Sequence, residues 1–215
     1  MTDVIVIDKL TKSFKGKTVL EDVNMQLQEG RIYGIVGDNG SGKTVLLKLI
    51  CGFMKPDSGT VTVNGKVIGK DADFPENTGI IIEAPGFLPN YSGMKNLEYL
   101  ASIRGKIGKE QIESAMKTVG LDPSSTLRGG KYSLGMKQRL GIAQAIMEDQ
   151  QLLILDEPMN ALDKDAVEEM RKLFLSFKAS GKTMLIVSHN EGDISTLCDE
   201  VYEFDGARIK RRENV

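Results

Sequence analysis

A glycine-rich segment near the N-terminus constrains the fold most strongly. Residues 37–44 read Gly-Asp-Asn-Gly-Ser-Gly-Lys-Thr, and they follow a short apolar run at 31–36 and precede a predicted helix. The pattern GxxxxGK[ST] between a strand and a helix is typical of a phosphate-binding loop. Glycines let successive backbone N–H groups turn toward an anion, and the helix start adds its dipole. The sequence therefore predicts a strand, a nucleotide-binding loop and a helix in direct succession.

The residues of this loop have separate expected roles. We expect the first six to surround the phosphates of a nucleotide; they are Gly37, Asp38, Asn39, Gly40, Ser41 and Gly42. Lys43 would place its positive charge on the β- and γ-phosphates, and Thr44 would place its hydroxyl on Mg²⁺. A chance glycine-rich turn is the alternative, and the flanking strand and helix argue against it.

The outer thirds of the chain contain strand patterns. In the first third, Asn64-Gly65 stands between two β-rich runs, as in a two-residue hairpin turn. In the last third, apolar runs at 151–158 and 183–189 lie on either side of an amphipathic helix at 163–179. Strands and helices that alternate in this way predict an α/β fold of the P-loop nucleotide-binding kind. Its mostly parallel sheet would be covered on both faces.

The middle third has the spacing of helices instead. Apolar residues recur at i, i+3, i+4 and i+7 in the run Ile112, Ala115, Met116 and Val119. We predict one domain, 1–215, in which a helical unit at 87–145 is inserted between two parts of a nucleotide-binding core, 1–86 and 146–215. The first part of the core is expected to include a small antiparallel β-subdomain.

Composition and charge exclude several classes of protein. The 215 residues include 28 Lys and Arg and 30 Asp and Glu, a net charge of −2, which gives no basic footprint for nucleic acid. No stretch approaches the roughly 18 apolar residues of a membrane span, and Asp3 and Asp8 stand where a signal peptide needs positive charge. Cys51 and Cys198 lie far apart without CxxC spacing, which suits a reducing cytosol. We expect a cytoplasmic protein.

A second group of candidates follows the apolar run at 152–155. Asp156 and Glu157 come directly after it, at the carboxyl end of a predicted parallel strand, where ligands bind in α/β folds. Asp156 suits a Mg²⁺ ligand, and Glu157 suits the general base that orients an attacking water. We expect Pro158 to keep Glu157 extended. An acidic turn is the alternative for this pair, and the phosphate-binding loop argues for a catalytic site.

Two further positions are candidates from their place in the pattern. His189 is the single histidine and follows the next buried strand, so we expect it at the same sheet edge as Asp156, near the γ-phosphate. Ser133 is a good N-cap, and Gly135 leaves the first turn of its helix uncovered, which suits an anion. A simple capped helix explains Ser133 and Gly135 equally well.

Taken in order, the motifs GDNGSGKT, YSLGMKQR, LLILDEP, NALD and SH resemble those of the ATP-binding cassette (ABC) ATPases. The resemblance covers essentially the whole chain. It implies that the nucleotide is ATP, that 133–137 is the signature loop, which reads a nucleotide bound to a second subunit, and that 160–163 is the D-loop at the subunit contact. It also implies that Phe14, where the family usually has Tyr, stacks on adenine; a core position is the alternative for Phe14.

The chain departs from the common family pattern at two points. The signature reads Ser-Leu-Gly-Met-Lys where Ser-Gly-Gly-Gln-Gln is common, although the serine and one glycine remain. Glu83 stands where the family has the Q-loop glutamine, and we expect its carboxylate to help bind Mg²⁺. A solvated loop carboxylate is the alternative. Both departures resemble the bacitracin-resistance and lantibiotic-immunity branch of the family.

The resemblance implies a subunit that hydrolyses ATP, with Glu157, His189 and Lys43 as its catalytic residues. Two copies would form a homodimer around two MgATP, and the loop at 84–93 would seat a separate integral membrane permease at the inner face of the cell membrane. The branch points to export of, or resistance to, antimicrobial peptides. Two alternatives remain open: an ABC ATPase outside transport, and a regulatory clamp that hydrolyses ATP slowly.

Overall fold

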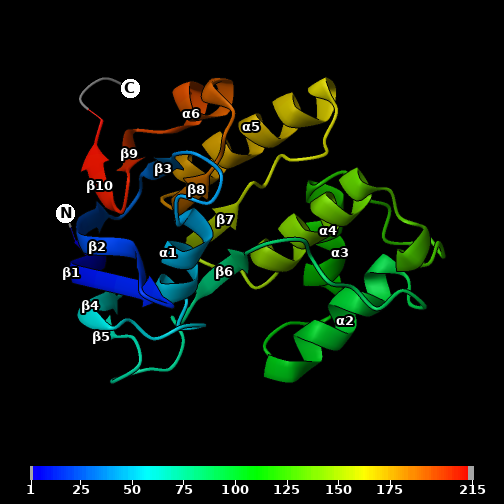
Figure 1. The fold of residues 1–215 in the computed structure, drawn as a ribbon. Helices are drawn as coiled ribbons and strands as arrows, with labels where there is room; N and C mark the ends of the chain where they lie inside the picture. The colour runs from blue at the N-terminus through cyan, green and yellow to red at the C-terminus, as the bar shows by residue number, and fades with distance from the viewer. Residues whose placement is uncertain (1, 213–215) are drawn as a thin grey trace.

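The computed structural model describes residues 2–212, and the strands in this part form two sheets (Figure 1). The smaller sheet is antiparallel and has the order β2-β1-β4-β5. Its strands are β1 (Asp3–Phe14), β2 (Lys17–Gln28), β4 (Ser58–Val63) and β5 (Lys66–Val67). Asn64 and Gly65 have φ angles of 49° and 76°, which is the geometry of a two-residue hairpin turn. This sheet is the antiparallel β-subdomain that the sequence predicts.

The larger sheet has the order β10-β9-β3-β8-β7-β6. Neighbours pair in parallel from β9 to β6, whereas β10 pairs antiparallel with β9. The strands are β3 (Ile32–Val36), β6 (Thr78–Ile81), β7 (Leu152–Asp156), β8 (Thr183–Val187), β9 (Glu200–Asp205) and β10 (Arg208–Arg211). Every residue of β3 and β8 is buried, which confirms the prediction of a mostly parallel sheet covered on both faces.

Two helices cover opposite faces of this sheet. Leu152 belongs to a buried cluster that includes α1 (Lys43–Ile50) and the antiparallel sheet. Leu153, its neighbour in β7, belongs to a second cluster with α5 (Lys164–Ala179). Successive residues of a strand point to opposite faces, so the two clusters lie on either side of the sheet. Helix α1 is thus packed against both sheets, and its N-terminus lies at the carboxyl end of β3.

The helices of the middle third lie beside the edge strand β6, away from the antiparallel sheet (Figure 1). They are α2 (Gly93–Arg104), α3 (Lys109–Thr118), the 3₁₀ helix η1 (Gly129–Lys131) and α4 (Leu134–Ile146). A Cβ atom added to Gly79 of β6 would lie 1.9 Å from the carbonyl oxygen of Ala145, so α4 packs directly on the backbone of β6. The division of the chain at residues 87 and 145 stays a prediction.

The last helix, α6 (Glu191–Leu197), follows β8. Its N-cap is Asn190, whose side chain accepts a hydrogen bond from the Gly192 N–H. This cap places the start of α6 directly after His189. None of the helices within residues 2–212 has the length and apolar character needed to cross a bilayer.

Candidate nucleotide-binding site

The candidate residues gather at the carboxyl ends of neighbouring strands. β3 leads into the loop at 37–42, β7 ends at Asp156, and β8 is followed by Ser188 and His189. Because β3, β8 and β7 are adjacent and parallel, these segments meet at one edge of the sheet. Ligands of open α/β sheets bind at this edge.

The backbone of the loop requires glycine at two positions. Gly37 has a φ of 150°, and a Cβ atom there would lie 2.8 Å from the Cβ of Phe204; Gly42 has a φ of 113°, and a Cβ atom there would lie 2.8 Å from Cγ1 of Val19. Both the conformation and the lack of space exclude larger residues. Gly42 is also the N-cap of α1 and offers no side chain to bond the first turn. The N–H groups of that turn can therefore serve an anion at the positive end of the helix.

Lys43 adds a positive charge to this helix start. The residue is 9% exposed, and its Nζ donates hydrogen bonds to the carbonyl oxygens of Gly37 at 2.7 Å and Asp38 at 2.8 Å. These bonds hold the ammonium group against the loop. An ammonium has three N–H donors, so its charge and its remaining donor lie beside the first turn of α1. The site concentrates positive charge where phosphates are expected.

Two oxygen-bearing side chains meet next to Lys43. Thr44 Oγ1 donates a hydrogen bond to Asp156 Oδ2 at 2.8 Å. Within residues 2–212, no group of three or more His, Cys, Asp and Glu side chains is placed to hold a metal ion. Mg²⁺ is typically held by one or two protein oxygens and completed by substrate phosphates and water. The Thr44–Asp156 pair fits that mode of binding.

Glu157 and His189 contact each other at the same edge. His189 Nδ1 lies 2.8 Å from Glu157 Oε2, and the side chains of His189 and Glu157 are 66% and 26% exposed. The Glu157 N–H donates a hydrogen bond to the Val187 carbonyl at 2.9 Å, which joins the ends of β7 and β8. A carboxylate in this position can accept a proton from water, and the imidazole can orient it.

The expected extended conformation of Glu157 is wrong. Its φ is 49°, in the left-handed region, because the chain turns here and the Asn160 N–H donates to the Glu157 carbonyl at 3.1 Å. Proline acts on the residue before it mainly by disfavouring the right-handed helical region, and it leaves this turn possible. Gln138 Nε2 of α4 donates to the carbonyls of Glu157 and Pro158, at 3.1 and 2.9 Å. The sequence gives no signal for Gln138, since a glutamine on a helix usually faces solvent.

Glu83 reaches the same site but is paired with a cation. It lines one cavity with Thr44 and Asp156, and its Oε1 lies 2.7 Å from Lys48 Nζ, with the Glu83 side chain 64% exposed. Lys48 lies four residues after Thr44 on α1, so the two side chains are neighbours on the helix surface. That spacing was the available signal for Lys48. Glu83 is placed near the Thr44–Asp156 pair while its charge is balanced by Lys48.

A cavity of about 640 Å³ brings most of the predicted residues together. Those that line it are Phe14, Asn39, Gly40, Gly42, Lys43, Thr44, Glu83, Asp156 and Glu157. Its volume lies in the usual range of ligand pockets. Phe14 is 40% exposed, and the Lys12 ammonium lies 5.5 Å from the centre of its ring. Phe14 is therefore a wall of the cavity and not a core residue.

Four of the predicted residues lie beside this cavity. Gly37, Asp38 and His189 line a neighbouring hollow of about 350 Å³, to which Asn39 also contributes. The hydroxyl of Ser41 is buried without a hydrogen-bond partner among the described residues. All four belong to the same edge of the sheet as the main cavity.

Ser133 and Gly135 are not brought into either hollow. Ser133 is the N-cap of α4, and its hydroxyl accepts a hydrogen bond from the Met136 N–H at 3.1 Å. Leu134, between them, is 71% exposed. Leu134 and Lys137 nevertheless line the main cavity, so the first turn of α4 is a capped helix start at the rim of that cavity.

Comparisons with known proteins agree with this geometry. The family model described as ABC transporter matches residues 20–160. The uncharacterized ABC transporter ATP-binding protein YybJ of Bacillus subtilis (strain 168) is 40% identical over 99% of this chain and 97% of its own. The bacitracin transport ATP-binding protein BcrA of Enterococcus faecalis is 40% identical over 100% of this chain and 70% of its own. The lantibiotic transport ATP-binding protein SrtF of Streptococcus pyogenes is 34% identical over 98% of this chain and 91% of its own.

The fold also matches solved structures. A dimeric post-hydrolysis state of the ATP-binding cassette MJ0796, bound to ADP and Pi, superimposes with a TM-score of 0.86 at 22% identity and covers 98% of both chains. This likeness confirms the predicted α/β fold. The named relatives confirm the resemblance to the bacitracin and lantibiotic branch, and they favour a transport subunit over an ABC ATPase outside transport and over a slow regulatory clamp. The chain belongs to the ATP-binding proteins of ABC transporters and is an ATPase of that family.

Proposed function

We propose that this chain hydrolyses MgATP between two copies of itself and so powers a separate membrane permease that moves peptide antibiotics. The observation that carries the proposal is the convergence of a cation, a metal-binding pair and a carboxylate at one sheet edge. Lys43 and the Thr44–Asp156 hydrogen bond lie on one cavity with Glu157. These are the groups that phosphoryl transfer to water requires.

Each group has one task in the reaction. Lys43 and the N–H groups at the start of α1 bind the β- and γ-phosphates and balance their charge. Thr44 and Asp156 hold Mg²⁺, which supplies further positive charge to the phosphates. Glu157 orients the attacking water and accepts its proton, and His189, 2.8 Å from the Glu157 carboxylate, holds that carboxylate toward the γ-phosphate. Phe14 stacks on adenine through its exposed face.

A second copy completes the site. Ser133 and Gly135 lie outside their own chain's cavity, on a helix start whose dipole and N–H groups suit a phosphate. We place them, with the helical unit 87–145 that carries them, against the γ-phosphate bound to the other copy. The MJ0796 structure is described as dimeric, which supports this arrangement. ATP is then the link that holds the homodimer together.

The permease docks in a second groove, on the side of Glu83 that faces away from the nucleotide cavity. A groove of about 510 Å³ runs between β6 and the helices α2 and α4, and the segment 84–86 forms part of its wall. Phe53 and Ile103 line the groove and are 54% and 71% exposed. Apolar side chains of this size on a groove suit an amphipathic helix of a partner. Docking there places the chain at the inner face of the cell membrane.

The substrate class follows from the named relatives. BcrA and SrtF are named for the transport of bacitracin and of a lantibiotic, both of which are peptide antibiotics. We assign the permease of this chain a substrate of the same chemistry.

Growth in the presence of antibiotic tests the whole proposal. The permease is first identified by its co-purification with the tagged chain. The two proteins are then expressed together in a sensitive host, and the inhibitory concentrations of bacitracin and a lantibiotic are measured. We expect a higher concentration with the wild-type chain and none of this gain with Lys43→Ala. Equal resistance in both strains would contradict ATP-driven export. A double variant with Phe53→Asp and Ile103→Asp should still hydrolyse ATP in the absence of permease. It should no longer co-purify with the permease and should give no resistance. Co-purification of this variant with the permease would contradict the docking site.

A further inference from the structure

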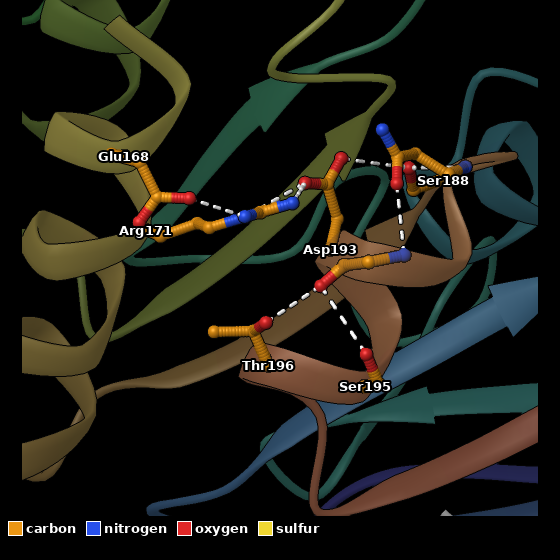
Figure 2. Close-up of polar contacts among 8 residues, drawn as sticks. Glu168, Arg171, Ser188, Asp193, Ser195 and Thr196 are labelled. Carbon is orange, nitrogen blue, oxygen red and sulfur yellow. Dashed lines mark hydrogen bonds and ion pairs between the residues drawn. The ribbon is translucent and has the colours of Figure 1, made fainter. Parts of the chain in front are cut away.

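A buried polar network joins two helices behind His189. Asp193 of α6 is 4% exposed, and its Oδ1 accepts hydrogen bonds from Arg171 Nε at 3.0 Å and Arg171 Nη2 at 2.6 Å. Its other oxygen, Oδ2, accepts a hydrogen bond from the Ser188 hydroxyl at 3.3 Å. Figure 2 shows Asp193 between Arg171, which reaches over from α5, and Ser188. One carboxylate therefore connects α5 to the segment that leaves β8.

Ser188 links Asp193 to the turn that carries His189. Ser188 is 3% exposed, and its hydroxyl also accepts a hydrogen bond from the Asn190 N–H at 3.1 Å. The backbone on either side of His189 is thus fixed by one buried hydroxyl. His189 itself has a side chain that is 66% exposed and touches Glu157, so packing around the imidazole does little to place it. Its position depends on the turn 188–190.

The surroundings of Arg171 stabilise its positive charge. Burial alone would lower the pKa of its guanidinium, but the hydrogen bonds and charges of Asp193 and Glu168 more than offset this, so its pKa lies above the ordinary value. A buried ion pair adds little net stability compared with apolar residues of similar volume. What it does add is a directed contact, since a guanidinium has a rigid planar fork of donors.

We propose that Arg171 and Asp193 are positioning residues, which hold the turn 188–190 so that His189 contacts the Glu157 carboxylate. This inference rests on the proposed role of Glu157 and His189 in hydrolysis. The N-cap of α5 is Asp163, whose side chain accepts a hydrogen bond from the Ala166 N–H at 2.9 Å. Asp163 belongs to the segment 160–163 expected at the subunit contact. The same helix therefore runs from that contact to the residue that holds His189 in place.

Single-turnover hydrolysis tests the proposal first. Asp193→Asn keeps the size of the side chain but removes the charge that holds Arg171. We expect roughly a ten-fold lower hydrolysis rate, which is the scale of a small misplacement of catalytic groups, with unchanged ATP affinity because Asp193 lines neither hollow. Glu200→Gln is the matched control. Its side chain is 11% exposed and pairs with Arg31 and Arg211 at the amino end of β9, and the rate should not change. An unchanged rate in Asp193→Asn would overturn the proposal.

A double-mutant cycle separates positioning from general destabilisation. If Asp193 acts through His189, then Asp193→Asn should lower the rate no further in a chain that already carries His189→Ala. A second ten-fold loss in that background would show that Asp193 acts by another route, and the proposal would fail. Should Asp193→Asn not fold, Arg171→Lys keeps the charge but loses the fork, and the same cycle is measured with it.

The single histidine gives a readout that does not need turnover. In a tag-free chain, His189 is the only source of imidazole signals in an NMR spectrum. We expect its resonances to shift in Asp193→Asn and in Glu157→Gln, and to stay in place in Glu200→Gln. Unchanged resonances in Asp193→Asn would overturn the positioning role. A wild-type chain that fails to hydrolyse ATP would instead contradict the proposed function, and the spectrum would still decide the positioning role.

Discussion

The sheet edge around residues 37–44 and the helix start at 133–135 are both candidate phosphate sites by sequence, yet the structure builds them differently. At the sheet edge, Lys43 and Thr44 are already fixed by bonds to Gly37, Asp38 and Asp156. At the helix start, the described contacts of the Ser133 hydroxyl go no further than its own helix. The first candidate site is assembled by the fold of one chain, whereas the second, under the proposed function, is completed only by a second chain.

The difference comes from where each site lies in the fold. The sheet edge draws on β3, β7 and β8, which are buried and pair in parallel, so any shift of one strand is resisted by its neighbours. The helix start lies on the middle helices, beside the edge strand, and carries the exposed side chain of Leu134. Changes at the sheet edge should therefore stop the reaction in each chain, whereas changes at the helix start should act on the association of two chains.

Lys43→Ala should have the largest effect, because it removes the cation that we expect to lie nearest to the phosphates. We expect ATP hydrolysis to fall by about 100-fold or more, in line with the loss of one strong charge-stabilising group. Lys109→Ala is the matched control: Lys109 also begins a helix after a glycine N-cap, in α3, and should leave the rate unchanged. Comparable rates for Lys43→Ala and the wild type would contradict the assignment of the sheet edge.

Ser133→Asp should leave the single chain intact and prevent ATP-dependent dimerisation. Aspartate is as good an N-cap as serine, so α4 stays stable, but its charge repels the γ-phosphate bound to the other copy. The measurement is size-exclusion chromatography with and without MgATP, with Glu157→Gln added to stop turnover. Ser92→Asp, at the N-cap of α2, serves as control and should still dimerise. A dimer that forms equally with either aspartate would argue against the composite site.

The sequence predicted the parts of this site that follow from local patterns. The glycines of the loop, the apolar strand ahead of Asp156 and the cap at Ser133 can each be predicted from a few neighbouring residues. The structure places them, in that order, in a loop, at a strand end and at a helix start. Three features escaped prediction: the turn at Glu157, the hydrogen bonds from Gln138 to its carbonyl, and the pairing of Glu83 with Lys48. The hydrogen bonds of Gln138 and the Glu83–Lys48 pair join segments far apart in sequence, which neither propensity nor periodicity describes. The turn at Glu157 is closed locally by the Asn160 N–H, and the effect of Pro158 on the residue before it does not predict this turn.

A substitution of Glu83 tests whether this residue takes part in Mg²⁺ binding at the sheet edge. Its carboxylate lies on the same cavity as Asp156 and Glu157. Without metal it should weaken nucleotide binding, by less than an unpaired charge would because Lys48 balances it. With Mg²⁺ present, the carboxylate should leave Lys48 for the metal and strengthen the binding of MgATP. We expect the ratio of ATP affinity with Mg²⁺ to ATP affinity without Mg²⁺ to be about five-fold larger in the wild type than in Glu83→Gln. This factor corresponds to about 1 kcal/mol, the scale for an exposed charge. Both proteins carry Glu157→Gln to stop turnover.

Glu76→Gln is the matched control for this titration. Glu76 has a side chain that is 69% exposed and pairs with Lys66 at 2.9 Å, outside the cavity, so its neutralisation should leave the Mg²⁺ dependence unchanged. Superimposable curves for the wild type and Glu83→Gln would remove Glu83 from the metal site and leave it as the partner of Lys48.

Leu134→Ala should have the smallest effect, at a residue that belongs to the helix start and also lines the main cavity. Since Leu134 is 71% exposed, its truncation should change the free energy of unfolding of the single chain by less than about 0.5 kcal/mol. In the MgATP dimer the same side chain is expected to lie partly covered, and its loss should weaken association roughly three-fold, less than full burial of a leucine would give. Ile103→Ala is the control, because Ile103 is equally exposed, at 71%, but faces the groove proposed for the permease. Without permease it should alter neither measurement. A dimer weakened equally by both changes would mean that exposed apolar area, and not the position of Leu134 next to Ser133, governs association.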